Sequence, residues 1–404
     1  MAWRACRCTL DDQQRPIELT HTWDLAIVGA GPAGTAAALA ALSAQPDLNV
    51  LLLDRSEFPR DKACGDGIAP QVLDVLGDVG IAGLLDDKVP VPRLRLERGE
   101  ASVSRVMARP AWVVPRRDFD SRLVNAAAAA GARLRKYRTR TVTMDSDAVI
   151  VNGDVRARVL VGADGAHSAV RTAVAVPAVR RQAFALRGYV NTPAARRGQQ
   201  VIVFGQSRQP SYAWSFDRGD GLANVGYGEL LTSKKPPLSR ELLLRQLDEL
   251  LPGAVRGGHG WLGHHLPLSS WRFAQPDGPV LLAGDAAGLI NPLTGEGIYY
   301  AVATGVLAGR AAVSALRAGQ PVSAGRRHRV AVRSLLARHL RHTALASRLV
   351  MAPPLVDAGL RAAARDQLVF DELVEIGLAQ GLMSRRLIQA LTRHIDAESS
   401  WTQR

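Results

Sequence analysis

The order of hydrophobic and polar residues divides the chain into three kinds of segment. Short aliphatic runs at 25–28, 50–53, 159–161 and 280–282 are typical of strands buried on both faces of a parallel sheet. An alanine-rich segment at 33–42 follows the first run and predicts a helix. Because strand, helix and strand in succession form the unit of a doubly wound sheet, we expect an α/β protein with a Rossmann-like domain.

Two further regions alternate apolar with polar residues. Residues 91–115 and 182–268 have the period of two that favours strands, and turn sequences such as DRGDG separate the runs of the second region. A helical pattern at 239–251 is inserted there. Residues 321–404 are helical by periodicity and are interrupted by a Pro-Pro pair. Their amphipathic faces could cover the strand-rich domain, lie on a membrane surface or form a dimer contact, with plain packing favoured.

The first strand runs into GAGPAG, a turn with three regularly spaced glycines. Gly29 permits the tight turn, Gly31 lets a pyrophosphate approach the backbone, and Gly34 lets helix and strand pack closely. The helix N-terminus presents free N–H groups to the phosphates. The second strand ends in Asp54, where an acidic side chain bonds a ribose hydroxyl. An isolated pattern of this kind also occurs in ordinary turns, but with these neighbours it predicts a dinucleotide site.

The segment after the second strand, DRSEFPRDKACGDGIAP, is a loop dense in glycine and charge. Such a loop beside a dinucleotide site is more often functional than filler. Cys64 lies in this loop and has two interpretations. It is either a buried small side chain or a thiol over the cofactor, with Arg60 and Lys62 favouring the thiolate.

Polar residues also occur near two predicted element ends. The segment PRRDFDSRLVNAAAAAGARL predicts a helix with Asp118 as its N-cap and Gly131 as its C-terminal stop. Arg116 stands just before this helix and by itself would be a solvated charge. Asp164 follows a buried strand and precedes a glycine, which suits contact with a ligand, although a simple turn explains it equally.

The segment GPVLLAGDAAGLINPLTGEGIYYA carries the most specific pattern of the chain. A buried strand leads to Asp285, which is placed to accept hydrogen bonds from hydroxyl groups. A long helix begins near Ile298, and the glycine turn at 295–297 offers backbone N–H groups at its N-terminus. These N–H groups suit a ligand that carries partial negative charge.

Three aromatic residues, Tyr212, Trp214 and Phe216, stand two positions apart. On a strand they share one face. Only 5% of the chain is aromatic, so this is a local concentration. Either the sheet packs on its own core there, or the strand forms an aromatic wall for a flat or apolar substrate.

Composition narrows the function classes. The chain has 404 residues, 47% of them hydrophobic, and a formal net charge of +14. The 46 arginines and five lysines are scattered without a basic tract, so we expect no nucleic-acid partner and favour attraction to an anionic membrane surface. We expect neither a transmembrane helix nor a signal peptide, and hence a cytoplasmic enzyme, peripheral to the membrane at most. The cysteines Cys6, Cys8 and Cys64 make neither a disulfide framework nor a metal site.

Three separated motifs, GAGPAG, GADGAHSAVR and LLAGDAAGLINPLTGEGI, occur in this order. Together they resemble the FAD-dependent oxidoreductases of the para-hydroxybenzoate hydroxylase fold. The segments DKACGDGI, YAWSF and NPLTGEGIYYA further resemble the geranylgeranyl reductase family, which includes archaeal and plant prenyl reductases and mycobacterial menaquinone reductase. The resemblance covers roughly residues 22–315, and the C-terminal region matches no motif.

The resemblance implies roles for individual residues. The turn glycines would hold the FAD pyrophosphate, Asp54 the adenosine ribose in place of the more usual Glu, and Arg116 the pyrophosphate or ribityl chain. Asp164 would support the FAD fold, Asp285 would bind a ribityl hydroxyl, and the turn at 295–297 would stabilise negative charge at the flavin N1–O2 edge. The cofactor-binding residues that it implies are Gly29, Gly31, Ala33, Gly34, Asp54, Arg55, Cys64, Gly65, Arg116, Asp164, Gly284, Asp285, Pro292, Gly295, Gly297 and Ile298, with no metal ligand.

The resemblance also assigns the substrate side. Cys64 matches a loop cysteine near the flavin and would be the catalytic residue, and Tyr212, Trp214 and Phe216 would bind substrate. The proline that usually follows this aromatic motif is Asp217 here, which changes the mouth of the pocket. The expected division is an N-terminal extension (1–21), an FAD-binding domain in three parts (22–90, 116–181 and 273–320), substrate-domain strands (91–115), an antiparallel-sheet substrate domain (182–272) and a helical C-terminal region (321–404).

The expected activity is FAD-dependent reduction of carbon–carbon double bonds in an isoprenoid chain of the geranylgeranyl or menaquinone type. Hydride from flavin N5 would be paired with proton delivery by Cys64 or by a water near it. The rival is a flavin monooxygenase or epoxidase acting on a similar apolar substrate, and a non-catalytic basic protein is a third class. Since no second dinucleotide fingerprint is visible, either NADPH or a ferredoxin-like protein would supply electrons.

Overall fold

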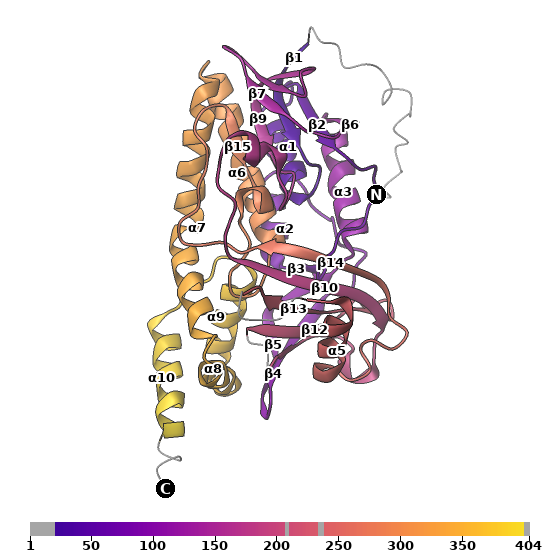
Figure 1. Cartoon of the computed structure of the whole chain (residues 1–404), viewed down its shortest axis with the longest axis vertical. Helices are drawn as coiled ribbons and strands as arrows, with labels where there is room; N and C mark the ends of the chain where they lie inside the picture. The colour runs from indigo at the N-terminus through magenta and orange to yellow at the C-terminus, as the bar shows by residue number, and fades with distance from the viewer. Residues whose placement is uncertain (1–20, 207–209, 233–237, 400–404) are drawn as a thin grey trace.

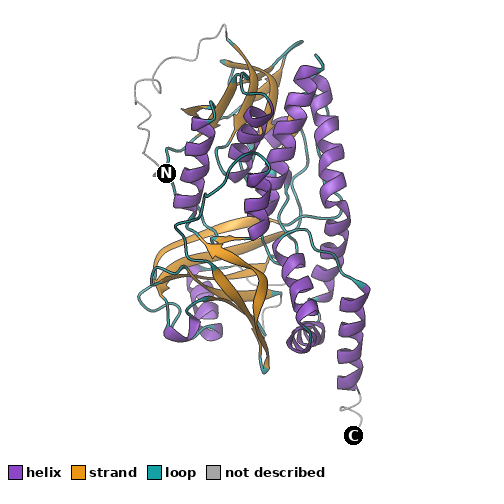
Figure 2. Ribbon diagram, turned by 180° about the vertical axis from the view of Figure 1, so that it is seen from behind, coloured by secondary structure: helices purple, strands orange, loops and turns teal. Residues whose placement is uncertain are grey.

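Two β-sheets lie one beyond the other along the long axis of the molecule, with long helices beside them (Figure 1). The computed structural model describes residues 21–206, 210–232 and 238–399. The predicted extension lies outside this range apart from its last residue, as do Cys6 and Cys8. The two sheets correspond to the two periodicities of the sequence, and the view from behind shows long helices running along one side of both, with further helices on other sides (Figure 2).

The first sheet contains the aliphatic runs. Its order is β6-β2-β1-β9-β8-β7, with β15 paired to β9. The pairs of β1 with β2 and β9, β2 with β6, and β9 with β15 are parallel, as the continuous apolar runs predict. The strands are β1 (Thr22–Val28), β2 (Val50–Asp54), β6 (Arg133–Lys136), β7 (Val142–Met144), β8 (Val149–Val151), β9 (Val155–Gly162) and β15 (Val280–Leu282).

The second sheet has the order β14-β10-β13-β12-β11-β4-β5-β3. Its pairs are antiparallel as expected, except that β4 and β11 are parallel, which the alternating pattern alone does not distinguish. This pair joins the early strands at 91–113 to the later ones, so both regions form a single sheet. The strands are β3 (Gly67–Ile68), β4 (Val91–Arg98), β5 (Ala101–Val113), β10 (Gln182–Asn191), β11 (Gln199–Phe204), β12 (Ser211–Asp217), β13 (Leu222–Leu230) and β14 (His259–Pro267).

Helices cover both sheets. α5 buries Leu243 and Leu247 against one face of the second sheet, and α8 and α9 bury Val356, Leu360 and Phe370 against β4 and β5. The C-terminal helices therefore cover the strand-rich part, one of the three placements expected for them. The helices are α1 (Pro32–Ala44), α2 (Pro70–Gly77), α3 (Arg116–Ala129), α4 (Ala169–Ala173), α5 (Arg240–Leu250), α6 (Ile298–Arg317), α7 (Ala324–Leu349), α8 (Pro353–Arg365), α9 (Gln367–Leu378) and α10 (Arg385–Ser399), with 3₁₀ turns at Ala194–Arg196, Gly284–Ala287 and Pro321–Ser323.

One predicted cap is wrong. The helix α3 begins at Arg116, and Asp118 lies in its first turn rather than at its N-cap. Pro115 is the N-cap, and the buried Asp66 carboxylate accepts a hydrogen bond from the Arg116 backbone N–H at 3.3 Å. Since an N–H of the first turn has no partner inside the helix, this long-range acceptor allows the helix to start three residues earlier.

The α6 helix forms the centre of the FAD-side core. It is long and apolar enough to cross a membrane, but 83% of the apolar window is buried inside the protein, which is typical of a core helix. Gly305 and Gly309 let it approach the backbone of α1, because a Cβ at either position would lie 2.2 Å from the carbonyl oxygen of Ala33 or of Ala37. Such contact fixes the position of the α1 N-terminus and its glycine turn.

Replacing Gly305 with Ala should force α1 and α6 apart. The expected loss is about 1–3 kcal/mol of the free energy of unfolding, the usual range for overpacking, and it should appear as a lower Tm together with a lower fraction of bound FAD. Gly77→Ala is the matched control, because its Cβ meets no atom within 4 Å. Equal Tm values for the two variants would contradict the packing argument.

Candidate active site

A single large cavity of about 930 Å³ runs from the glycine turn of the first sheet to the aromatic strand of the second. Of the residues expected to bind cofactor or substrate, all except Gly34 and Gly284 line it. Gly34 instead permits close packing, since a Cβ there would lie 1.8 Å from the carbonyl oxygen of Gly29. Gly284 has a positive φ of 58° and donates its N–H to Thr304. The fold thus gathers around one space residues that are widely separated in the chain.

The glycine turn leaves room above the backbone. Gly29 has a φ of 102°, and a Cβ on it would lie 2.3 Å from the carbonyl oxygen of Ala163. A Cβ on Gly31, by contrast, would meet only the ends of the Arg60 and Arg116 side chains, at 3.5 and 4.0 Å. Gly31 is also the N-cap of α1 and has no side-chain partner for the helix N–H groups. A phosphate can therefore approach this backbone between two guanidinium groups.

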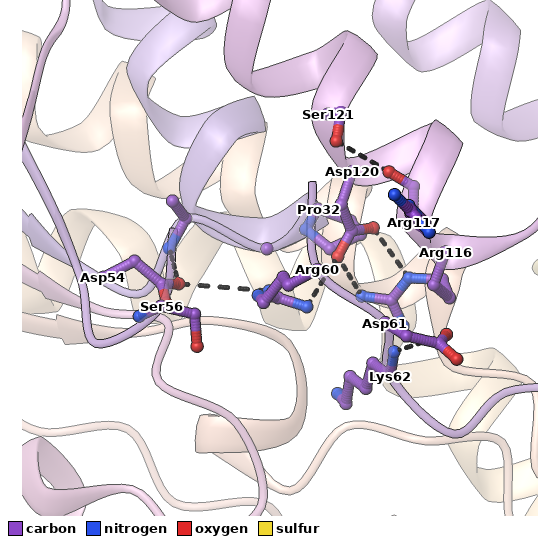
Figure 3. A network of polar contacts seen from close by, with 12 residues as sticks. Pro32, Asp54, Ser56, Arg60, Asp61, Lys62, Arg116, Arg117, Asp120 and Ser121 are labelled. Atoms are coloured by element: carbon purple, nitrogen blue, oxygen red, sulfur yellow. Dashed lines mark hydrogen bonds and ion pairs between the residues drawn. The ribbon is translucent and has the colours of Figure 1, made fainter. Parts of the chain in front are cut away.

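Asp54 lies at the end of β2 and is 8% exposed. One carboxylate oxygen accepts the Ala30 N–H at 2.8 Å, and the other accepts the Ser56 N–H at 2.8 Å (Figure 3). The side chain therefore ties the glycine turn to the start of the next loop. Asp54 also lines the cavity, next to Arg55. The sequence predicts that it binds a ribose hydroxyl of the dinucleotide.

A buried ion cluster lies between the loop and α3. Asp120 is fully buried and accepts two hydrogen bonds from Arg116, both at 2.7 Å. Arg60 lies 3.1 Å from the same carboxylate, as Figure 3 shows. The two arginines thus share Asp120, and Arg60 also lies 3.9 Å from the Asp54 carboxylate, so two guanidinium groups and two carboxylates meet beside Gly31. Sequence reasoning named Arg116 but missed Asp120, although their spacing of four residues on a helix was a usable signal.

Asp285, which follows β15, forms an ion pair with Lys62, with 3.1 Å between Lys62 Nζ and Asp285 Oδ2. Burial opposes ionisation of Asp285, but the charge and hydrogen bond of Lys62, together with the charge of Arg116, outweigh it and hold its pKa below the usual range. Burial, with Lys62 adding to it, lowers the pKa of His264 to about 4. Near neutral pH the cavity wall here therefore carries an ionised carboxylate beside a neutral imidazole.

Asp164 caps the short helix α4. Its carboxylate accepts the Ala169 N–H at 2.7 Å and the Ser168 hydroxyl. Burial raises its pKa, and these hydrogen bonds oppose the change. These contacts leave little of the carboxylate for a ligand, and the supporting role of Asp164 in the FAD fold stays a prediction.

The glycine turn lies at the N-terminus of α6 as predicted, but the first N–H groups of that helix already have an acceptor within the protein. Gly295 has a φ of 76°, and Gly297 is the N-cap of α6. Glu296 accepts the N–H groups of Ile298 and Tyr299 at 2.7 and 3.0 Å. Burial raises its pKa to about 7, opposed by these N–H groups, so this carboxyl is partly neutral near pH 7. Pro292 lines the cavity beside this turn.

The loop that carries Cys64 is fastened to the second sheet. Asn224 on β13 donates to the Cys64 carbonyl at 2.9 Å and to the Asp66 carboxylate at 2.8 Å. Trp214 in turn donates to Asn224 at 2.8 Å, and the Tyr189 hydroxyl donates to Asp66 at 2.6 Å. Asp66 has a positive φ of 61°, which this network holds in place. None of these anchors was named from sequence except Trp214.

Cys64 lines the cavity as a neutral thiol. Burial raises its pKa to about 11, and the nearby Arg116 only partly offsets this. The expectation that Arg60 and Lys62 favour a thiolate is wrong, because their charges are used by Asp120 and Asp285. A protonated thiol is suited to give a proton rather than to attack as a nucleophile.

The aromatic strand faces the cavity as predicted. The ring centroids of Tyr212 and Trp214 are 5.8 Å apart, and those of Trp214 and Phe216 are 6.4 Å apart. The Tyr212 hydroxyl donates to the Thr294 carbonyl, which ties β12 to the turn before α6. Asp217 accepts hydrogen bonds from Thr192 and from the Gly198 N–H and is not among the residues that line the cavity. Its replacement of the usual proline therefore leaves the wall itself unchanged.

Comparisons with known proteins agree with this geometry. The profile of the FAD binding domain family matches residues 22–213. Menaquinone reductase of Mycolicibacterium smegmatis is 34% identical over 312 residues, which are 70% of this chain and 75% of that protein. Digeranylgeranylglycerophospholipid reductase 1 of Methanopyrus kandleri is 33% identical over 314 residues, 73% of this chain and 81% of that protein. The chain belongs to the geranylgeranyl reductase family.

The fold of a solved structure is similar over almost the whole chain. A geranylgeranyl bacteriochlorophyll reductase-like protein from Thermoplasma acidophilum has a TM-score of 0.77 at 21% identity, with 94% of this chain and 98% of that chain covered. Like other members of the geranylgeranyl reductase family, this chain is an FAD-dependent oxidoreductase. The open backbone at Gly31 and the flanking guanidinium groups fit a dinucleotide pyrophosphate.

Replacing Asp120 with Asn should leave the buried Arg116 without its carboxylate, and it should leave Arg60, which is 19% exposed, with Asp54 alone. Breaking a buried ion pair from one side costs about 3–5 kcal/mol, so we expect a marked fall in Tm and loss of FAD, measured by thermal unfolding and by flavin absorbance after gel filtration. Asp87→Asn is the matched control, because Asp87 pairs with Arg122 while 59% exposed, and an exposed pair contributes at most about 1 kcal/mol. If Asp120→Asn and Asp87→Asn have the same Tm, the ion cluster does not stabilise the fold as argued.

Proposed function

We propose that this member of the geranylgeranyl reductase family reduces carbon–carbon double bonds in an isoprenoid chain of the geranylgeranyl or menaquinone type. The observation that carries the proposal is the apolar half of the cavity. Side chains of the second sheet and of the C-terminal helices line it, including Leu94, Leu96, Ile202, Phe204, Val356, Leu360, Leu373 and Val374. An isoprenoid chain offers no hydrogen-bonding groups, so such walls suit it.

The cofactor end has residues for each part of FAD. We propose that the turn glycines and the helix N-terminus bind the pyrophosphate, with Arg60 beside Arg116 as a further partner. Asp54 would bind the adenosine ribose, Asp285 a ribityl hydroxyl, and the turn at 295–297 the N1–O2 edge of the flavin. The support is placement, since all of these residues except Gly34 line the same cavity.

When bound and reduced, FAD supplies the hydride for one carbon of the double bond. The other carbon needs a proton, and we propose that the Cys64 thiol gives it. With a pKa of about 11 the thiol holds its proton throughout the neutral range. The thiolate left behind is stabilised by Arg116, whose charge acts to lower this pKa, and it regains a proton from water. The aromatic wall would hold the chain in position and exclude water.

Electrons must reach FAD from outside, and we propose NADPH or a ferredoxin-like protein as the donor. Among the residues that the structure describes, one unit has the geometry of a dinucleotide site. It consists of β1, the glycine turn and α1. NADPH would therefore react from the open cavity rather than from a domain of its own. Loss of yellow flavin absorbance on adding NADPH without oxygen, or only on adding reduced ferredoxin, distinguishes the two donors.

Product masses test the proposed reaction. The purified, FAD-loaded enzyme, incubated without oxygen with a chemical reductant and either geranylgeranyl diphosphate or a menaquinone, should add two hydrogens for each double bond reduced. Mass spectrometry of the extracted lipid measures this gain. A product heavier by one oxygen, formed only in air, would instead show the rival monooxygenase or epoxidase activity.

Replacing Cys64 with Ala should lower turnover by about 100-fold or more, the usual contribution of a positioned general acid, while FAD stays bound. Because the protonated thiol is the active form and its pKa is raised, the wild-type rate should hold through neutral pH and fall only as pH approaches about 11. Steady-state rates across pH for the wild type, Cys64→Ala and Cys64→Ser check both points. An undiminished rate in Cys64→Ala would remove the residue from the mechanism.

We also propose that the enzyme contacts an anionic membrane through the C-terminal end of α7. Leu345, Leu349 and Met351 are 49%, 37% and 49% exposed there, and Arg341 and Arg348 are exposed beside them. Leu349 also lines the cavity, so a lipid-borne chain would enter at this surface. Exposed apolar and basic side chains together favour binding to anionic lipid.

The double variant Leu345→Ser, Met351→Ser should bind less to phosphatidylglycerol vesicles, because each replacement removes apolar surface that would enter the lipid. Co-sedimentation measures the bound fraction. Val330→Ser is the matched control, because Val330 is 62% exposed on the same helix but lies far from this end. Equal loss in both variants, or no loss in the double variant, would contradict the placement of the surface.

A further inference from the structure

Glu296 is a carboxyl group at the place proposed for the N1–O2 edge of the flavin. It lies in the glycine turn before α6 and lines the cavity. The first N–H groups of a helix have no acceptor inside the helix. Here Oε1 of Glu296 accepts two of them, from Ile298 at 2.7 Å and from Tyr299 at 3.0 Å. The carboxylate thus occupies donors that would otherwise stabilise the negative charge of a ligand.

The backbone of the turn that carries Glu296 is fixed by its neighbours. The Glu296 carbonyl accepts the Asn291 N–H at 2.8 Å, and the Glu296 N–H donates to the Thr294 hydroxyl at 3.3 Å. The Tyr212 hydroxyl donates to the Thr294 carbonyl, and the Asn291 side chain donates to the Ile376 carbonyl of α9 at 2.8 Å. Because these contacts hold the turn in place, negative charge added beside it acts on the carboxyl group rather than moving the backbone.

The Glu296 carboxyl has one oxygen available for a proton. In the part of the chain that the structure describes, both hydrogen bonds to this carboxyl go to Oε1, and no basic side chain lies within ion-pair distance of it. Oε2 can therefore be protonated while Oε1 keeps both N–H groups. Protonation removes the negative charge and turns Oε2 from an acceptor into a hydrogen-bond donor.

The surroundings of Glu296 decide how readily it holds that proton. Burial raises its pKa to about 7 against the effect of the two N–H groups. Arg116 on α3 lowers this pKa, and Asp285, whose Oδ1 lies 3.6 Å from the Cβ position of Gly297, raises it. The other titratable groups that interact with Glu296 are neutral near pH 7, because burial raises their pKa values: Cys64, Tyr212 and Tyr300. A further negative charge beside the turn raises the pKa of Glu296 again, since like charges disfavour ionisation.

We propose that Glu296 takes up one proton from solvent when the bound flavin is reduced and releases it when the flavin is oxidised again. Two electrons and one proton, or equally one hydride, go from the external donor and solvent to the flavin, and the second proton goes to Oε2 of Glu296. The donor is that of the proposed function, NADPH or a ferredoxin-like protein. A neutral carboxyl no longer repels the charge of the reduced flavin, so reduction becomes easier. The inference rests on the proposed function for the position of the flavin edge.

Midpoint potentials of the bound FAD test the inference without any substrate. A titration with dithionite and a reference dye at each pH gives the potential, which falls by about 30 mV per pH unit for each proton taken up with two electrons. Below about pH 7 Glu296 is protonated before reduction and adds no slope, whereas above about pH 7 it gains its proton on reduction. The potential of the wild type should therefore fall by about 60 mV per pH unit above pH 7.

Glu296→Gln keeps an oxygen for the two N–H groups but takes up no proton. Its potential should fall by about 30 mV per pH unit above pH 7. Reduced-minus-oxidised infrared spectra of the wild type should contain the signal of a newly protonated carboxyl group, and this variant should lack it. Glu375→Gln is the matched control, because burial raises the pKa of Glu375 too but this residue does not line the cavity. It should keep both the wild-type slope and the infrared signal.

Two results would overturn the proposal. One is a wild-type slope of about 30 mV per pH unit above pH 7. The other is an equal slope in the wild type and Glu296→Gln, because the flavin itself would then take up both protons. If the slopes differ as expected but no double bond is reduced, the proton uptake stands and the proposed reaction fails. Reduction of the double bond by an enzyme whose slope does not depend on Glu296 gives the converse.

Discussion

The carboxylate of Asp66 joins the parts of the molecule that form the active site. It accepts hydrogen bonds from Tyr189 on β10 and Asn224 on β13 in the second sheet, and from the backbone of Arg116 at the start of α3. Burial raises its pKa to about 6 even with these donors present. Because a buried carboxylate is stable only when it is fully hydrogen-bonded, the loop between β2 and α2 has one favourable position. That position places Cys64 against the aromatic wall and closes the cavity between the two sheets.

Charge within the cavity follows a consistent arrangement. At the FAD end, arginines, a lysine and aspartates neutralise one another in pairs and clusters, and the guanidinium groups of Arg60 and Arg116 lie beside the turn where a pyrophosphate would approach. Around Cys64, burial dominates and keeps the thiol neutral despite a nearby arginine. At the substrate end, the walls are mainly aliphatic and aromatic. The electrostatic character of these three regions suits them in turn to binding phosphate, to holding a proton and to accepting a hydrocarbon chain.

The glycine turns and strand-end carboxylates could be located from sequence because each depends on local geometry. A strand followed by G-x-G-x-x-G has few conformations open to it, and residues two apart on a strand share a face whatever surrounds them, as Tyr212, Trp214 and Phe216 do. The N-cap of α3 could not be located in this way, because it depends on Asp66, fifty residues earlier in the chain. The protonation state of Cys64 was missed for a related reason, since its charged neighbours in sequence turn out to pair with Asp120 and Asp285.

The sequence by itself determined the α/β class, the dinucleotide turn, the aromatic strand and the family, because these are encoded in periodicity and in short motifs. Only the tertiary structure decided which charges meet. Asp120 between two arginines, Asn224 on the Cys64 loop and Ser347 on Arg181 are pairings across up to 166 residues of chain. Burial, which sets the pKa values of Cys64 and Glu296, likewise depends on how the sheets and helices close around the cavity. Such contacts arise from packing of distant segments, and no local pattern specifies them.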